Sequence, residues 1–120
     1  MNVFDASALL AFVQGEDSDL VEEALGRGGV CGTANWSEVA QKIAAAGRDW
    51  ELAKALLSSY DLDLEPVTAT DAERAAGLWV RGSGLSLGDR LCLALGHRLA
   101  ADVLTADTSW GTGQRIRQIR

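Results

Sequence analysis

Hydrophobic positions along the chain fall into short apolar runs and longer segments of helical periodicity. The short runs at residues 2–4, 30–33 and 102–107 predict buried strands that end at polar side chains. Residues 62–67 alternate apolar and acidic side chains, and residues 115–120 alternate basic and apolar ones. Because such alternation is typical of strands with one solvated face, we expect both segments near the edges of a sheet.

Segments with apolar residues every three or four positions predict the helices. They cover residues 7–14, 34–47, 48–60 and 85–100, and a further helix follows the acidic residues 16–19. Another helix is predicted to open at Thr70, because Thr70 and Glu73 have the spacing of a capping box. Since helices separate most of the strands, the fold class is α/β, a three-layer α/β/α sandwich with a mainly parallel central sheet.

The composition is that of an ordinary globular protein. With 120 residues, 48% of them hydrophobic, we expect a single domain over residues 1–120. Cys31 and Cys92 each lie in an apolar run and are expected as small buried side chains in a reducing compartment. Asp5 interrupts the N-terminal apolar stretch that a signal peptide needs, and no run approaches the roughly 18 apolar residues of a membrane helix. We therefore expect a cytoplasmic protein that does not bind membranes.

The formal net charge of −6 changes the range of expected partners. It argues against non-specific binding of nucleic acid, which depends on Lys and Arg side chains at phosphates. It does not exclude an enzyme that acts on nucleic acid, because local acids can hold metal ions while local arginines contact phosphates. The candidates for such contacts are Arg81, Arg90 and Arg98, and Arg90 has a local ion pair with Asp89 as its alternative.

Four acidic residues are expected at one edge of the predicted sheet. Asp5 and Asp107 each end a predicted strand, and Glu38 and Asp89 lie in the first turns of predicted helices. Each pair of carboxylates repels by about 3 kcal/mol at about 5 Å and an effective dielectric constant of about 20. A cation or protonation of some acids has to compensate this repulsion. Oxygen ligands without His or Cys favour one or two Mg²⁺ or Mn²⁺ ions.

Each of these acids also has a purely structural alternative. Asp5 has the position of a cap for the helix that starts near Ser7, and Asp107 that of a cap for a short last helix. Ser86 and Asp89 have the spacing of a capping box. A glutamate such as Glu38 most often lies on a solvated helix face. The joint placement of all four acids favours a metal site over four separate caps.

The histidine and the tryptophans give weaker signals. His97 is the only histidine, and without a partner at a suitable spacing it predicts no zinc site. Trp110 stands beside Asp107 and is the candidate for stacking on a nucleic-acid base. The other three tryptophans have helical spacing, so we expect them in the core or in an interface.

Taken together, the chain resembles a PIN domain, and specifically a VapC-type toxin of a bacterial toxin–antitoxin pair. The resemblance lies in the stretches VFDASALLAFV, NWSEVAQKI, LSLGDRLCLALGHRLAADVLTAD and IRQIR, which occur in the order of the family. Two features depart from the family: Thr108 stands where a basic residue is common, and the segment 111–114 is short enough that we expect a turn in place of a helix.

The resemblance implies an endoribonuclease that depends on Mg²⁺ or Mn²⁺, with a PIN-like fold over the whole chain. It implies that the catalytic and metal-binding acids are Asp5, Glu38, Asp89 and Asp107, with Asp5 and Asp89 as direct ligands. Ser7 and Thr105 fall where the family has small hydroxyl residues that support the site. The implied partners are an RNA substrate, for which transfer RNA is one candidate, a cognate antitoxin and a second copy of the chain. Arg90 and Trp110 then become candidates for contact with RNA.

The helix predicted at residues 7–14 carries more apolar side chains than one sheet-facing stripe needs. These side chains are Leu9, Leu10, Phe12 and Val13. We expect part of this surface to contact the antitoxin or a second copy of the chain, and full burial within the fold is the alternative.

Two other functions compete with cleavage of RNA. One is a PIN-like module that binds RNA or protein without cleaving it. The other is a phospho-acceptor signalling domain, which also gathers acids at the strand ends of a parallel sheet. That function needs paired acids near the end of the first strand and a lysine in the cleft, whereas Ala6 follows Asp5, and Lys42 and Lys54 lie on predicted helices.

Overall fold

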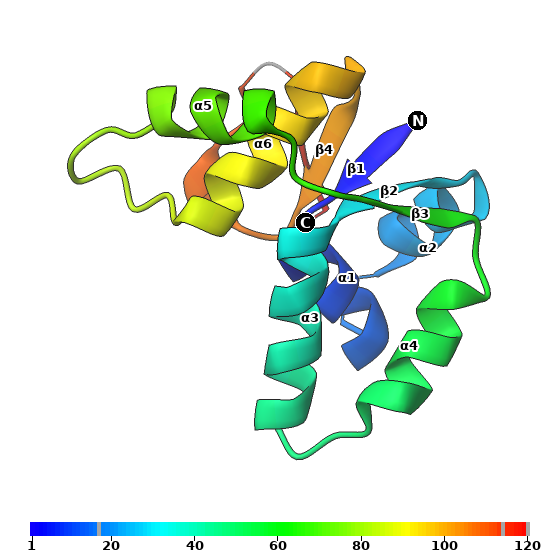
Figure 1. Ribbon diagram of the computed structural model, residues 1–120. Helices are drawn as coiled ribbons and strands as arrows, with labels where there is room; N and C mark the ends of the chain where they lie inside the picture. Colours follow the sequence, from blue (N-terminus) through cyan, green and yellow to red (C-terminus); the bar gives the residue numbers. More distant parts are fainter. Residues whose placement is uncertain (17, 114, 120) are drawn as a thin grey trace.

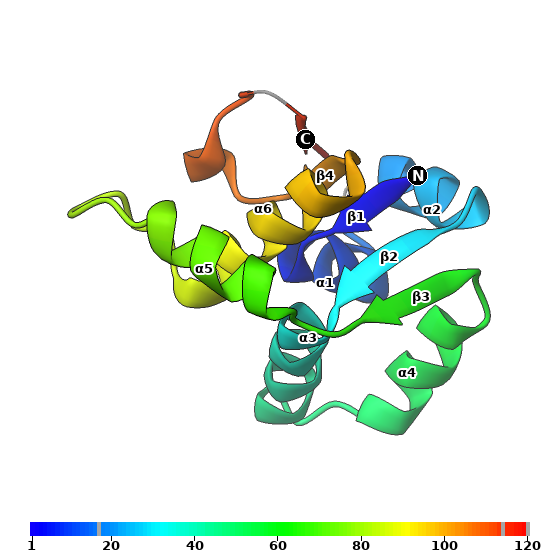
Figure 2. The same cartoon turned by 45° about the horizontal axis from the view of Figure 1, so that its top comes forward.

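The computed structural model describes residues 1–16, 18–113 and 115–119, and a five-stranded parallel sheet forms its centre (Figures 1 and 2). The strands are β1 (Asn2–Phe4), β2 (Gly29–Gly32), β3 (Leu62–Glu65), β4 (Asp102–Thr105) and β5 (Ile116–Gln118). Their order is β3-β2-β1-β4-β5, and every pair of neighbours is parallel. The prediction that residues 62–67 and 115–120 form edge strands is confirmed, except that Arg120 lies outside the described residues.

The described residues form six α-helices, which flank the two faces of the sheet. They are α1 (Ala6–Gln14), α2 (Asp19–Gly26), α3 (Thr33–Ala45), α4 (Trp50–Ser58), α5 (Ala69–Gly77) and α6 (Leu87–Leu99). Phe4 and Leu104 on one face pack against α1 to α4, and Val3 and Val103 on the other pack against α6. The α/β class with three layers is therefore confirmed, and both cysteines are buried free thiols, as predicted.

The start of α5 differs from the prediction by two residues. Thr68, not Thr70, is the N-cap: its hydroxyl accepts a hydrogen bond from the backbone N–H of Asp71, whose carboxylate accepts one from the N–H of Thr68. Glu73 is exposed, whereas Asp71 is buried. The acid that closes the capping box is thus the one that is removed from water, and this buried acid fixes where the helix begins.

Helices α5 and α6 form an arm that projects from the sheet (Figure 1). Arg98 Nε donates to Asp71 Oδ1 over 2.9 Å, and the same guanidinium pairs with Glu65 at the end of β3 over 3.4 Å. Arg90 Nη1 donates to the carbonyl of Ala75 over 2.9 Å, which holds α5 against α6. These contacts fix the arm, and with it the first turn of α6, relative to the sheet.

The chain between β4 and β5 forms a single turn of 3-10 helix, η1 (Thr108–Trp110). The predicted turn in place of a family helix is therefore confirmed for the part of this segment that the structure describes. Across residues 1–16, 18–113 and 115–119, none of the helices has the length and apolar character needed to cross a bilayer.

The Asp71–Arg98 contact predicts how stability changes with pH. Burial raises the pKa of Asp71, but the hydrogen bonds from Arg98 and Thr68 outweigh it and leave the pKa below its ordinary value of 3.8. A carboxyl whose folded pKa is depressed stabilises the fold at neutral pH and loses that contribution as the pH falls through the folded pKa. Asp71→Asn should therefore cost about 1–3 kcal/mol of unfolding free energy at pH 7 and less at pH 3.

Urea unfolding at both pH values measures this difference, and Glu73→Gln controls for the change in net charge on the same helix. An equal loss at pH 3 and pH 7 for Asp71→Asn would contradict the assigned ion pair.

Candidate active site

Asp5 directly follows β1 and lies at the carboxyl edge of the sheet, between β1 and α1. Its side chain is 3% exposed and makes no hydrogen bond that caps α1, although it occupies the N-cap position. Instead, Oδ2 accepts hydrogen bonds from Ser7 Oγ over 2.6 Å and from Thr105 Oγ1 over 2.9 Å. The side chain of Asp5 therefore does not cap the helix, which was its structural alternative.

Two hydroxyl groups connect Asp5 to the end of β4. Ser7 Oγ accepts a hydrogen bond from the backbone N–H of Ala106 over 2.9 Å, and Thr105 Oγ1 accepts one from the N–H of Asp107 over 3.0 Å. The two hydroxyl oxygens lie 3.2 Å apart. Because β1 and β4 are neighbours in the sheet, this network holds the Asp5 carboxylate in one orientation.

Glu38 lies in the second turn of α3 and meets the first turn of α6. The buried side chain of Asn35 donates to Glu38 Oε1 over 3.1 Å and to the carbonyl of Gly88 over 3.2 Å. A Cβ atom at Gly88 would overlap Glu38 Oε1, so glycine is what allows the two helices to approach here. Sequence reasoning missed Asn35, although an Asn three residues before Glu38 on the same helix face was a usable signal.

Asp89 closes a capping box at the start of α6. Its Oδ2 accepts from the N–H of Ser86 over 2.9 Å, and Ser86 Oγ accepts from the N–H of Asp89 over 3.1 Å. The structural alternative considered for Asp89 is thus present. The same carboxylate also lies close enough to Asp5 and Glu38 to raise the pKa of both. Capping and a place in the acidic cluster are compatible for Asp89.

The raised pKa values of Asp5 and Glu38 indicate that the acids of this site repel one another. Burial raises the pKa of Asp5, the hydrogen bonds from Ser7 and Thr105 lower it, and the charge of Asp89 raises it further. Burial also raises the pKa of Glu38, and the charges of Asp5 and Asp89 add to this effect against Asn35 and Lys42. The acidic cluster of Asp5, Glu38 and Asp89 therefore favours the approach of a cation.

Asp107, the fourth predicted acid, caps η1 in this structure. Its Oδ1 accepts from the backbone N–H of Ser109 over 2.9 Å and from Ser109 Oγ over 2.6 Å. Its charge is not among the causes that raise the pKa of Asp5 or Glu38. The structure brings three of the four acids together and engages the fourth in the cap that was its alternative. A role for Asp107 as a ligand stays a prediction.

The two candidates for RNA contact are both engaged within the fold. Trp110 is 8% exposed and packs in the core beside Val3 and Val103, because η1 turns its ring inward. Stacking of Trp110 on a base is therefore wrong for this conformation. Arg90 is half-buried and donates to the carbonyl of Ala75 instead of forming the local ion pair with Asp89, and its contact with an RNA phosphate stays a prediction. Its guanidinium instead holds α5 against α6.

The apolar side chains of α1 divide into buried and half-buried ones. Leu9 is 0% exposed and is not available to a partner, so the prediction is wrong for Leu9. Leu10 is buried but borders a surface pocket with Ser7, and its contact with a partner stays a prediction. Phe12 packs edge-on against Tyr60, with ring centres 5.6 Å apart. Val13 is half-buried and borders a surface groove with α3 and α4. Helix α1 packs against β4, α2 and α3, so more than one side of it is buried.

The donor set of the acidic cluster fits a hard divalent cation. Its members are carboxylates, and Mg²⁺ is commonly bound by one or two carboxylates together with waters and substrate phosphates. As the side chains stand, the described part of the chain contains no group of three or more His, Cys, Asp or Glu residues arranged to hold one ion.

The chain is similar to a protein family and to a solved structure. The PIN domain family matches residues 3–112 of the chain. A solved structure described as a toxin–antitoxin complex from Klebsiella pneumoniae superimposes with a TM-score of 0.82 and 18% sequence identity, covering 100% of this chain and 98% of that chain. At this identity the likeness shows a shared fold. No curated protein sequence matches the chain.

PIN domains are in general nucleases and usually use divalent metals. The match over nearly the whole length shows that the chain belongs to the PIN domain family.

Proposed function

We propose that this protein is an endoribonuclease that depends on Mg²⁺ or Mn²⁺ and acts as the VapC-type toxin of a toxin–antitoxin pair. The observation that carries the proposal is the acidic cluster of Asp5, Glu38 and Asp89 at the carboxyl edge of a parallel sheet in a PIN domain. The toxin role is supported by the fold shared with a toxin–antitoxin complex. We further propose that residues 1–120 form one domain and that it works in the cytoplasm.

Asp5 and Asp89 are the residues that would hold one or two ions in this proposal. A bound divalent ion supplies a water of lowered pKa and neutralises charge on the scissile phosphate. Ser7 and Thr105 orient the Asp5 carboxylate through hydrogen bonds to Oδ2. Their contribution is to keep Asp5 in place as charge builds up on the phosphate.

Glu38 is the carboxylate suited to accept the proton of the attacking water. Burial and the neighbouring acids raise its pKa, which makes it a stronger base than an ordinary glutamate. Asn35 fixes Glu38 by donating to Oε1, so the side chain is held without being neutralised. Asp107 would be available to a second ion, directly or through water, only with its carboxylate released from Ser109.

The second candidate is a PIN-like module that binds RNA or protein without cleavage. One observation favours it: Asp107 is engaged by Ser109, so the conformation shown assembles three acids and not four. The phospho-acceptor alternative loses its basis, because the chain belongs to the PIN domain family.

Cleavage of total RNA by the purified protein separates these functions. With Mg²⁺ or Mn²⁺ the wild type should cleave, EDTA should stop cleavage, and Asp5→Asn or Asp89→Asn should lower the rate on the order of 100-fold or more. Asp63→Asn on the exposed edge strand β3 is the matched control. Wild-type protein that gives the same cleavage pattern as Asp89→Asn would show a contaminating nuclease and contradict the proposal.

A change at Gly88 tests whether the position of Glu38 matters. Gly88→Ala places a methyl group where Glu38 Oε1 lies, and the flexible glutamate has to move away. The cleavage rate should fall on the order of 10- to 100-fold. The melting temperature should hold or rise, because Ala favours a helix by up to about 1 kcal/mol over Gly. Gly77→Ala, where nothing lies near the added methyl, is the control. Unchanged cleavage by Gly88→Ala would remove Glu38 from the mechanism.

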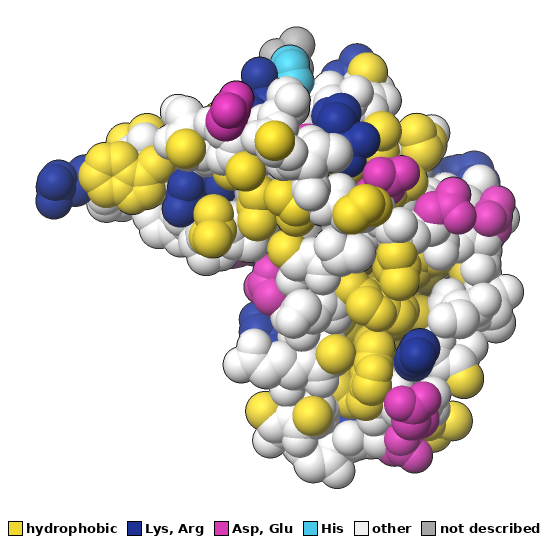
Figure 3. Space-filling view, viewed as in Figure 1, with side chains coloured by type: hydrophobic (Ala, Val, Ile, Leu, Met, Phe, Trp, Pro, Cys, Tyr) yellow, Lys and Arg dark blue, Asp and Glu magenta, His cyan; other side chains and the backbone are white. Residues whose placement is uncertain are grey.

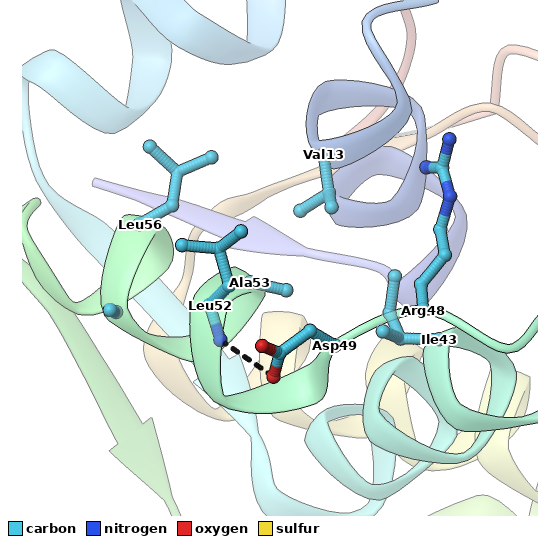
Figure 4. Close-up of a pocket in the computed structure, with 8 residues that line it drawn as sticks. Val13, Ile43, Arg48, Asp49, Leu52, Ala53 and Leu56 are labelled. Atoms are coloured by element: carbon cyan, nitrogen blue, oxygen red, sulfur yellow. Dashed lines mark hydrogen bonds between the residues drawn. The ribbon is translucent and has the colours of Figure 1, made fainter.

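A groove on the face away from the arm is the surface we propose for the antitoxin. It has a volume of about 680 Å³ and lies between the end of α1, the end of α3 and α4 (Figure 4). Val13, Ile43 and Ala53 line it, and Leu52 is 70% exposed at its rim. Figure 3 shows hydrophobic side chains gathered between α3 and α4. An apolar segment of a partner protein fits this groove, because water leaves the leucines when it binds.

Leu52→Glu should weaken neutralisation by the antitoxin without changing cleavage by the free protein. The antitoxin used is the product of a short reading frame next to the gene, co-expressed and co-purified. Leu64→Glu makes the same change at an exposed position on β3 and should leave binding intact. If Leu52→Glu is neutralised as tightly as wild type, the groove is not the antitoxin surface. The homodimer implied by the family resemblance stays a prediction, which light scattering of the free protein measures.

A further inference from the structure

Trp79 is the exposed tryptophan of this chain, and it lies on the arm. Its side chain is 55% exposed at the end of α5. Trp36 and Trp50 are half-buried and pack edge-on against each other, and Trp110 is buried. All four tryptophans belong to the described part of the chain, so the position of Trp79 stands out among them. With Val80, which is 61% exposed, Trp79 forms a continuous apolar surface, and exposed apolar patches mark binding sites.

Arg81 lies over the ring of Trp79, with its guanidinium carbon 5.6 Å from the ring centre. No carboxylate of the described residues pairs with Arg81, whereas Arg27, Arg98 and Arg115 each have one. The tip of the arm therefore presents a flat aromatic surface beside a cation that is free to meet an anion. Other arginines of the described chain also lack a carboxylate partner, so Arg81 is distinguished by its position over an exposed ring.

The loop that carries this pair has a defined shape. The N–H of Ser83 donates to the carbonyl of Val80 over 3.1 Å, and the N–H of Leu85 donates to Ser83 Oγ over 3.3 Å. Gly82 and Gly84 both have φ of +77°, a left-handed conformation that glycine adopts without strain. The tip is thus an ordered turn at the outer end of the arm (Figure 2).

The same loop runs directly into the acidic cluster. Ser86 and Asp89 form the capping box of α6, and Gly88 contacts Asn35 and Glu38. The chain that leaves Arg81 therefore reaches the cluster within eight residues. Figure 3 shows the molecule hollowed between the arm and the lower helices, with acidic side chains at the inner corner. A strand bound at the arm tip has an open path to this corner.

We propose that the arm tip binds single-stranded RNA, with a base stacked on Trp79 and a phosphate paired with Arg81. This inference rests on the proposed function, because it places the contact beside the site of cleavage. Stacking on aromatic side chains combined with cations along the backbone is how proteins hold single strands without reading their sequence. Trp79 takes the stacking role that the sequence assigned to the buried Trp110.

RNA is favoured over a second copy of the chain by the position of Arg81. Arg81 follows the exposed apolar side chains of Trp79 and Val80 and lies over the ring of Trp79. Burying it against another protein costs free energy unless a carboxylate meets it in the right place. Every nucleotide of an RNA strand brings its own phosphate, so a single strand satisfies the ring and the cation together.

Binding of a fluorescein-labelled single-stranded RNA of about 12 nucleotides, followed by anisotropy in EDTA, tests the proposal without cleavage. Trp79→Leu should weaken binding about tenfold, and Trp79→Phe should restore most of the loss because it keeps a ring. Arg81→Gln should lower the slope of log Kd against log salt by about 0.7, the contribution of one phosphate on a single strand. Arg27→Gln on α2 removes an equal charge far from the arm and should leave the slope almost unchanged.

Two results would overturn the proposal. One is that Trp79→Leu and Arg81→Gln bind the RNA with the same affinity as the wild type. If the wild type also cleaves RNA in Mg²⁺, the ribonuclease function is unaffected by this result. The other is that light scattering shows a dimer that Trp79→Leu converts to a monomer, which assigns the arm to contact between copies. If binding depends on Trp79 and Arg81 but nothing is cleaved with metal, the RNA site stands and the nuclease function fails.

Discussion

The hydrogen bonds that hold the buried carboxylate of Asp5 between Ser7 and Thr105 are the contacts on which the rest of the site depends. They join the end of β1 to the end of β4, and they keep a group that water would otherwise solvate inside the protein. Burial alone raises the pKa of Asp5, so the two hydroxyls offset part of the cost of its charge. The parallel pairing of β1 with β4 is what brings Thr105 within reach. The fold therefore fixes the centre of the acidic cluster before any ligand binds.

Three surfaces of different chemical character lie around this centre. The acids gather at the carboxyl edge of the sheet, the apolar groove lies between α3 and α4, and the exposed ring and cation lie on the arm. The ion pairs of Arg98 with Asp71 and Glu65 fix the arm to the sheet, so the arm tip keeps its position relative to the acidic cluster. The cleavage, inhibition by a partner and substrate binding that we propose therefore involve distinct residues, which can be altered one at a time.

The parallel sheet, its two edge strands and the capping box of Asp89 could be predicted from the sequence, because each depends on local pattern or spacing. The placement of Trp110 could not, since only the path of η1 decides whether its ring turns into the core. Asn35 and Gly88 escaped notice for a similar reason: their importance arises where α3 and α6 meet, far apart in sequence. Spacing indicates Thr70 and Glu73 as the capping box of α5, whereas the structure forms it from Thr68 and the buried Asp71.

The central claim is that the acidic cluster binds a divalent ion through Asp5 and Asp89. Anomalous diffraction from crystals soaked in Mn²⁺ tests this most directly, because it locates the ion independently of any activity. The account predicts an anomalous peak within about 2 Å of carboxylate oxygens of Asp5 and Asp89, absent from crystals of Asp5→Asn. A peak elsewhere on the protein with none at these carboxylates, or a peak that persists unchanged in Asp5→Asn, would contradict it.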